Sequence, residues 1–157
     1  NKFISEAFKK KASIAIVNTI NKNYNKKHQV KVNDTLKFLT KSSKIYRQNI
    51  NTKIIAITGS CGKTTLKELL GTSLKQISKV SISPKSYNNK YGVPLSLFNL
   101  VQKNDYGVLE IGMDKKGEID YLSKIVKPDV SVITNINYAH AKNFKNIKQI
   151  ALAKAEI

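Results

Sequence analysis

The 157 residues are enough for one ordinary domain or for parts of two. With 41% hydrophobic residues and no apolar run of membrane-spanning length, the composition is typical of a globular protein without membrane insertion. The formal net charge is +18, but only Arg47 among the 28 basic residues is an arginine, and the lysines are scattered along the chain. Because clustered charge makes a nucleic-acid surface, we expect acidic, phosphate-rich ligands and no nucleic-acid partner.

The first fifty residues have their own pattern. Residues 12–17 and 30–32 read as strands, and residues 34–47 read as a helix capped by Asn33 or Asp34. Residues 49–52 read as a linker. We therefore expect residues 1–50 to form a small separate α/β unit or the end of one.

After residue 50, strands and helices alternate with short connections. The expected strands are residues 54–58, 80–83, 106–111 and 130–135. The expected helices are residues 64–74, with Leu66, Leu69, Leu70 and Leu74 on one face, residues 94–101, residues 118–125 and a last one that starts near Asn146. This alternation predicts an α/β fold, a parallel sheet with helices on both faces.

A glycine-bracketed loop follows the first of these strands. Gly59 and Gly62 lack the Cβ atoms that would keep the backbone from a phosphate chain, Lys63 offers a positive charge, and Thr64 offers a hydroxyl to a metal ion. The expected phosphate-binding residues are Gly59, Ser60, Cys61, Gly62, Lys63, Thr64 and Thr65. The usual first glycine is replaced by Ile57, so the loop is of the shorter T-G-x-x-G-K-T-T variety.

Further polar residues follow two other expected strands. Glu110 lies near the end of the third and Asn135 ends the fourth, with His140 five residues later. Because ligands bind beyond the carboxyl ends of parallel strands, we expect these residues near Lys63 and Thr64. Magnesium prefers oxygen ligands, so Thr64 and Glu110 suit it, whereas His140 is either a ligand or a structural residue.

Six segments in order and spacing carry a family resemblance: ITGSCGKTT, NNKYGVPLSL, LEIGMDKKGEI, VKPDVSVITNI, AH and AKAEI. They resemble the central domain of the Mur ligases over residues 53–157. NNKYGVPLSL and the LEIGM…GEI pair favour the MurF type over its sister ligases. Residues 1–50 resemble, more weakly, the end of the family's N-terminal uridine-nucleotide domain, and we expect the family's C-terminal domain to be absent from these 157 residues.

The resemblance implies roles for single residues. Gly59 to Thr65 would hold the β- and γ-phosphates of ATP, and Thr64 with Glu110 would bind a first Mg²⁺. His140 would join Glu110 at a second Mg²⁺, which Lys154 would orient as a carbamate. The asparagines Asn88, Asn89 and Asn135 would lie at the nucleotide. The expected catalytic residues are Lys63, Glu110, His140 and Lys154.

The resemblance also implies an activity, the ATP-dependent joining of D-alanyl-D-alanine to UDP-N-acetylmuramoyl-tripeptide through an acyl phosphate. Two alternatives remain: another Mur or folylpolyglutamate-type ligase, and a non-enzymatic phosphate-loop module. The single cysteine, Cys61, suits the reducing cytoplasm. We expect a monomer, and a fragment open at both ends that is inactive as a ligase on its own.

Overall fold

The computed structural model describes residues 3–101, 103–138 and 143–157. The chain divides into two compact units, one up to Lys41 and one from Ser42 onward. The helix α2 (Thr35–Gln48) contains the division. Asp34 caps this helix, as one of the two predicted caps, because its Oδ1 accepts hydrogen bonds from the backbone N–H groups of Leu36 and Lys37 at 2.8 and 2.9 Å.

The first unit is built around a pair of short parallel strands. These are β1 (Ala15–Val17) and β2 (Gln29–Lys31), with Ala15 opposite Gln29 and Val17 opposite Lys31. A helix, α1 (Ile4–Lys9), precedes them, and a 3₁₀ turn, η1 (Lys26–His28), leads into β2. The two predicted strands are therefore present.

The start of the first unit differs from the expectation. The sequence pattern did not predict α1, and β1 begins three residues later than predicted. The reason is that Ala12 is still tied to the end of α1: its N–H donates to the carbonyl of Ala7 at 3.0 Å, and Lys11 turns the chain with a φ of 64°.

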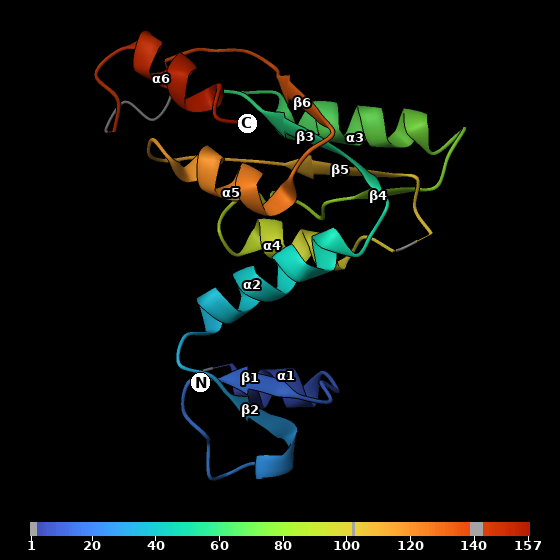
Figure 1. The fold of residues 1–157 in the computed structure, drawn as a ribbon, viewed down its shortest axis with the longest axis vertical. Coiled ribbons are helices and arrows are strands. Elements are labelled where there is room, and N and C mark those ends of the chain that lie inside the picture. Colours follow the sequence, from blue (N-terminus) through green and yellow to red (C-terminus); the bar gives the residue numbers. More distant parts are fainter. Residues whose placement is uncertain (1–2, 102, 139–142) are drawn as a thin grey trace. The chain divides into compact units, whose positions relative to one another are not determined.

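The second unit contains a four-stranded parallel sheet, and the predicted fold class is confirmed (Figure 1). Its strands are β3 (Lys53–Thr58), β4 (Val80–Ile82), β5 (Tyr106–Glu110) and β6 (Val130–Ile133), in the order β4-β5-β3-β6. The central strand β3 pairs with β5 on one side and β6 on the other, with Ile57 opposite Glu110 and Thr58 opposite Ile133. The ends of these three strands therefore meet at one edge.

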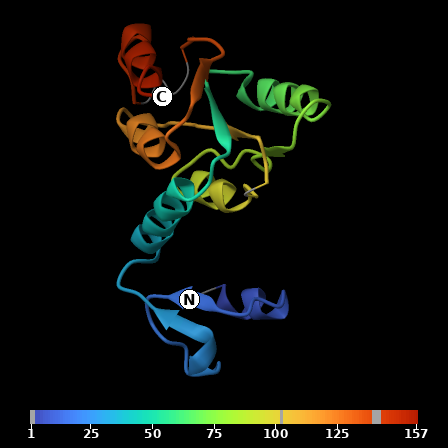
Figure 2. The same ribbon diagram turned by 45° about the vertical axis from the view of Figure 1, so that its right-hand side comes forward.

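Helices cover both faces of this sheet, as Figures 1 and 2 show. The helix α3 (Lys63–Leu74) packs on β4 and β5, while α4 (Gly92–Phe98) and α5 (Glu118–Val126) pack together on the opposite side. The last helix is α6 (Ile147–Lys154), which starts where expected, and Asn146 caps it by accepting from Gln149 N–H at 3.0 Å. The largest core contains apolar residues of β3, β5, α4, α5 and α6, among them Ile54, Leu109, Leu97, Leu122 and Ile150.

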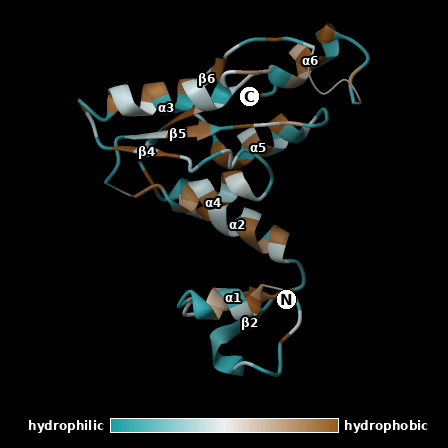
Figure 3. Ribbon diagram, turned by 180° about the vertical axis from the view of Figure 1, so that it is seen from behind, coloured by the Kyte–Doolittle hydropathy of each residue, from teal (hydrophilic) through white to brown (hydrophobic). Residues whose placement is uncertain are grey.

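The leucine face predicted for α3 lies only partly against the sheet. Leu66, Leu70 and Leu74 are half-buried, whereas Leu69 is 62% exposed, and the fully buried residues are Lys67 and Gly71. Gly71 faces Ile82 so closely that a Cβ there would lie 2.3 Å from the Ile82 Cδ1. This close approach turns α3 so that residues 67 and 71 meet the sheet, and hydrophobic colour remains visible along the helix in Figure 3.

The segment predicted as a linker is an integral part of the second unit. Ile50 is buried in the core, and the Arg47 guanidinium donates to the carbonyls of Thr52 and Val126 at 3.2 and 2.7 Å. Arg47 also pairs with Asp129 at 3.1 Å. Residues 49–52 therefore form an ordered entry to β3. None of the helices in the described residues has the length and hydropathy needed to cross a membrane.

Candidate active site

The phosphate loop joins the end of β3 to the start of α3, and both glycines have backbone conformations that favour glycine. Gly62 precedes α3 with a φ of 77°, and Gly59 has a φ of 151°. A Cβ on Gly59 would lie 1.8 Å from the Thr134 hydroxyl oxygen, whereas one on Gly62 would meet nothing within 4 Å. Gly59 is thus needed for close packing against the end of β6, and Gly62 for the turn into the helix.

Hydrogen bonds fasten this loop to the segment after β6. Ser60 N–H donates to the Asn135 carbonyl at 3.1 Å, and Cys61 N–H donates to Asn135 Oδ1 at 3.1 Å. The Thr134 hydroxyl donates to the Cys61 carbonyl at 2.6 Å, and the Ser60 hydroxyl donates to the Asn137 carbonyl at 2.9 Å. Asn135, predicted as a nucleotide-binding residue, therefore holds the shape of the loop.

Lys63 is the first residue of α3, and its ammonium donates to the Gly59 carbonyl at 2.9 Å. The side chain therefore folds back over the loop that the two glycines form. The first N–H groups of a helix lack partners within the helix and, with the helix dipole, attract anions. Lys63 and the start of α3 together make an electropositive position at the carboxyl edge of the sheet.

Glu110 and Thr64 lie side by side at this edge. The Thr64 hydroxyl donates to Glu110 Oε2 at 2.8 Å, and Asn88 Nδ2 donates to the other oxygen, Oε1, at 2.7 Å. Glu110 is only 1% exposed, so its carboxylate is fixed by these two neutral donors. The strand order brings Glu110 and Thr64 together as predicted, and Asn88 joins them from the loop after β4.

Asn89 is the neighbour of Asn88, but its side chain binds the nearby backbone. Its Oδ1 accepts from the backbone N–H groups of Tyr91 and Gly92 at 3.0 and 2.9 Å, which caps the start of α4. The predicted role of Asn89 at the nucleotide stays a prediction, whereas the side chain of Asn88 points to Glu110.

Lys154 ends α6 and is 1% exposed. Burial, and to a smaller extent the charge of Lys63, lower the pKa of Lys154 from its ordinary value of 10.5 to about 8, against a smaller opposing effect of Cys61. The influence of Lys63 and Cys61 means that the end of α6 lies within electrostatic range of the phosphate loop. An amine with this pKa is partly neutral near physiological pH.

Sequence reasoning missed two residues that shape this region. Lys67 is fully buried, and its ammonium donates to the Ser83 carbonyl at 2.9 Å. Glu156 accepts hydrogen bonds from Gly117 N–H at 3.0 Å and from Asp120 N–H at 3.3 Å, so it joins the end of α6 to the start of α5. A lysine inside an otherwise leucine-rich helix and the glutamate of AKAEI were the available signals.

His140 lies outside the described residues, so its predicted ligand role stays a prediction. Among the residues that the structure does describe, no group of three or more His, Cys, Asp or Glu side chains could hold a metal ion. The pair of Thr64 and Glu110 still fits a magnesium ion, since a buried carboxylate and a hydroxyl are hard oxygen donors that leave room for phosphate oxygens and water.

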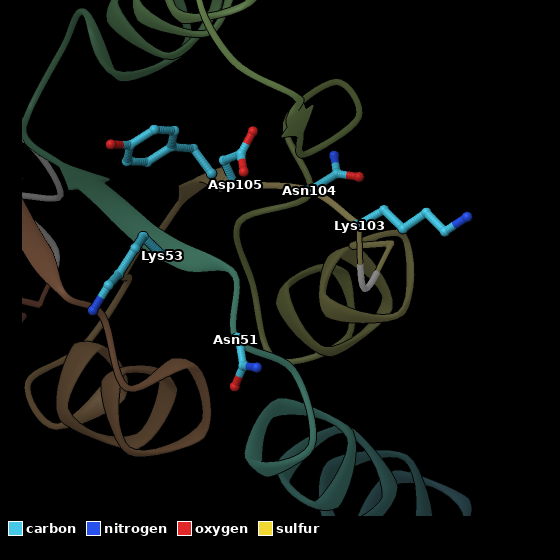
Figure 4. Close-up of a pocket in the computed structure, with 6 residues that line it drawn as sticks. Asn51, Lys53, Lys103, Asn104 and Asp105 are labelled. Atoms are coloured by element: carbon cyan, nitrogen blue, oxygen red, sulfur yellow. The ribbon is translucent and has the colours of Figure 1, made fainter.

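A separate surface pocket lies at the opposite edge of the sheet (Figure 4). It has a volume of about 340 Å³ and is lined by Asn51, Lys53, Lys103, Asn104, Asp105 and Tyr106. Lys53 begins β3 and Tyr106 begins β5, so this pocket is at the amino ends of the strands. It is therefore no part of the phosphate loop, which follows the carboxyl end of β3.

Comparison with known proteins gives a consistent result. The family model described as Mur ligase middle domain matches residues 57–157. The chain is 40% identical to the UDP-N-acetylmuramoyl-tripeptide–D-alanyl-D-alanine ligase of Bacillus subtilis over 126 residues, 80% of this chain and 28% of that protein. It is 36% identical to the ligase of the same name from Buchnera aphidicola subsp. Baizongia pistaciae over 155 residues, 99% of this chain and 34% of that protein.

Solved structures agree with the sequence comparison. A crystal structure of MurF from Acinetobacter baumannii superposes with a TM-score of 0.86 and 39% identity, covering 99% of this chain and 34% of that one. The MurF ligase from Thermotoga maritima in complex with ADP gives a TM-score of 0.82 and 33% identity, covering 99% and 36%. The chain thus spans about a third of the length of these relatives. Since the family model covers more than half of its residues, the chain belongs to the Mur ligase family.

Proposed function

We propose that the protein is an ATP-dependent ligase of the MurF type, which joins D-alanyl-D-alanine to UDP-N-acetylmuramoyl-tripeptide. The observation that carries this proposal is the contact of the Thr64 hydroxyl with the buried Glu110 carboxylate at 2.8 Å, beside a phosphate loop. The relatives named for this reaction, and the related structure in complex with ADP, support it. ATP and Mg²⁺ are the proposed cofactors.

In this reaction the γ-phosphoryl group passes from ATP to the terminal carboxylate of the tripeptide, which releases ADP and leaves an acyl phosphate. The amine of D-alanyl-D-alanine then attacks the acyl carbon, phosphate leaves and the amine loses a proton. Lys63 and the backbone N–H groups at the start of α3 would hold the phosphates and stabilise the charge that develops during the transfer.

Thr64 and Glu110 would hold one Mg²⁺, with His140 proposed at a second. A bound magnesium ion supplies positive charge that neutralises the phosphate oxygens. Asn88 donates to Glu110 Oε1 and so keeps Oε2 turned toward Thr64. Asn89, at the start of α4, and Asn135, beside the phosphate loop, are also proposed to lie near the bound nucleotide.

Lys154 is proposed to become a carbamate. Only a neutral amine reacts with carbon dioxide, losing a proton as the N–C bond forms, and the pKa of Lys154 of about 8 provides such an amine. The product is an anion where the lysine was a cation. The carbamate would no longer repel the positive charge of Lys63, and it could orient a metal ion at the carboxyl edge of the sheet.

We also infer the roles of the two parts of the chain. Residues 1–50 would be the end of the uridine-nucleotide domain and residues 51–157 part of the central ATP-binding domain. The MurF structures that cover 99% of the chain, and hence the first fifty residues too, support this assignment. We further propose a monomer that works in the cytoplasm, where its nucleotide substrates are made available.

Phosphate release by the full-length protein tests this function. With ATP, UDP-N-acetylmuramoyl-tripeptide and D-alanyl-D-alanine present, we expect release of phosphate that stops when any one of the three is left out. Equal release with a single amino acid such as glutamate in place of D-alanyl-D-alanine would instead favour a sister ligase or the folylpolyglutamate type.

A further inference from the structure

Lys67 is, with Lys154, one of two lysines whose side chains are fully buried among the described residues of the second unit. It lies one turn after Thr64 on α3, at the contact with the sheet, and its exposed fraction is zero. Burying an ammonium group costs free energy unless polar partners replace the lost water. An apolar residue of similar length would avoid that cost. The role of Lys67 must therefore be sought in the polar contacts of its ammonium group.

The ammonium of Lys67 binds the backbone that leaves β4. It donates to the carbonyl of Ser83 at 2.9 Å and to the carbonyl of Lys85 as well. The ammonium also forms an ion pair with Glu68, whose side chain is 55% exposed and whose Oε1 lies 3.2 Å from the Lys67 Nζ. The charge thus fastens residues 83–85 to α3 through main-chain atoms, at a point where Lys85 has a left-handed φ of 47°.

Both ends of residues 83–88, which we name the β4 loop, contact Glu110. At one end, the Ser83 hydroxyl accepts from Glu110 N–H at 3.3 Å. At the other, Asn88 Nδ2 donates to Glu110 Oε1 at 2.7 Å, and the Asn88 carbonyl accepts from Gly112 N–H at 2.8 Å. Any shift of the β4 loop would therefore move the partners of Glu110.

These contacts form a closed circuit. Thr64 and Lys67 lie on α3, Lys67 holds the β4 loop, the β4 loop holds Glu110, and Glu110 accepts from Thr64. Resting on the proposed function, we propose that Lys67 is a positioning residue, which sets Asn88 against Glu110 and thereby holds the carboxylate toward Thr64 for the metal ion.

The test separates this role from plain stabilisation of the fold. In the full-length protein, Lys67→Met keeps the length and removes the charge, Asn88→Ala removes the contact with Glu110, and the double variant combines both. Lys124→Met is the matched control, because Lys124 is also a helical lysine in an ion pair but is 68% exposed. The measurement is the affinity for Mn²⁺ in the presence of ADP, by electron paramagnetic resonance of the free ion.

We expect Lys67→Met and Asn88→Ala each to weaken Mn²⁺ binding by about tenfold, the lower end of the effect of removing groups that orient a metal ligand. The double variant should bind Mn²⁺ as Asn88→Ala alone does, because both changes break one chain of contacts. Hydrogen exchange in the β4 loop should become faster in Lys67→Met. Lys124→Met should change neither.

Two results would overturn the proposal. One is a Lys67→Met protein that melts at a lower temperature but binds Mn²⁺ like the wild type. The other is a double variant whose loss equals the product of the single losses. If Lys67→Met does not fold, Lys67→Gln replaces it with the same expected pattern, because its amide is uncharged and one atom shorter and so weakens the contacts with the carbonyls of Ser83 and Lys85. Failure of the wild-type ligase assay would refute the proposed function alone, because the Mn²⁺ titration uses no ligase substrate.

Discussion

Two carboxylates, at opposite edges of one sheet, are satisfied in different ways. At the amino edge, Asp129 accepts from Ile54 N–H at 2.8 Å and forms ion pairs with Lys53 and Arg47, both at 3.1 Å. At the carboxyl edge, Glu110 is more deeply buried, yet the described residues give it only neutral donors, Thr64 and Asn88. Among the residues that the structure describes, no cation forms an ion pair with Glu110.

The difference separates a structural site from the proposed reactive one. Asp129 has its counter-charges within the protein, so it ties the entry of β3 to the start of β6 and needs nothing more. Glu110 has no ion pair with a cation among the described residues, so its carboxyl oxygens are available for the metal ion that we propose there. Variants at the carboxyl edge should therefore change the chemistry, and variants at the amino edge should change only the stability.

The largest effect is expected from Lys63→Ala in the full-length protein. Turnover should fall by about 10²–10³-fold, because the variant removes a charge that stabilises the transferred phosphoryl group. Lys53→Ala at the amino edge is the control, with turnover unchanged, since an exposed ion pair contributes little to stability. Steady-state phosphate release measures both. Equal losses of turnover in the two variants would contradict the distinction between the two edges of the sheet.

A smaller loss is expected from Lys154→Ala, of about ten- to a hundredfold in turnover, as for other groups that orient metal ligands. Short carboxylates such as acetate should restore part of the activity if they replace a carbamate. In the wild type, carbamate formation should increase as the pH rises through the Lys154 pKa of about 8, because the amine becomes neutral. Carbon-13 NMR with labelled bicarbonate would detect it, and the absence of both loss and rescue would contradict it.

The two loop glycines should differ in their tolerance of alanine. Gly59→Ala combines a strained φ of 151° with a Cβ that would lie 1.8 Å from the Thr134 hydroxyl, so it should lower the free energy of unfolding by about 1–3 kcal/mol and weaken ADP binding. Gly62→Ala meets no atom and should cost about 1 kcal/mol from its left-handed φ alone. Denaturant unfolding and ADP titration would compare the two; a larger cost at Gly62 would contradict the packing argument.

The smallest effect concerns Asp129→Asn, which should lower the free energy of unfolding by about 1 kcal/mol without changing turnover per folded molecule. Burial alone would raise the pKa of Asp129, but the hydrogen bond from Ile54 N–H and the charges of Lys53 and Arg47 lower it below 3.8. A carboxyl group with a lowered pKa stabilises the fold above its unfolded-state value, and that contribution is lost as the pH falls through the folded-state value. The variant should therefore lose less stability than the wild type between neutral pH and pH values below 3.8, as measured by thermal melting.

Local patterns predicted most of the sheet and its edge. Apolar runs followed by glycine or asparagine identified β3, β5 and β6, and a general rule for parallel sheets then brought Glu110 and Asn135 to the phosphate loop. That rule can be applied to a sequence because it requires only the direction of each strand and the residue at which it ends. Thr64 and Glu110 meet because β5 is the direct neighbour of β3.

Other features depend on packing that no local pattern encodes. The leucines of α3 suggested a core face, but Gly71 brings the helix close to Ile82 and turns Lys67 inward. The asparagine pair looked equivalent in sequence, yet Asn88 donates to Glu110 while Asn89 caps α4. The role of Arg47 also depends on carbonyls about eighty residues away, those of Val126 and Lys127.

The attachment of the phosphate loop to Asn135 divides its amides into two classes. The N–H groups of Ser60 and Cys61 already donate to Asn135, whereas those at the start of α3 lack partners within the helix. A bound phosphate should therefore slow hydrogen exchange at residues 62–65 and leave residues 60 and 61 almost as protected as before. The footprint of a nucleotide on this loop would thus coincide with the first turn of α3.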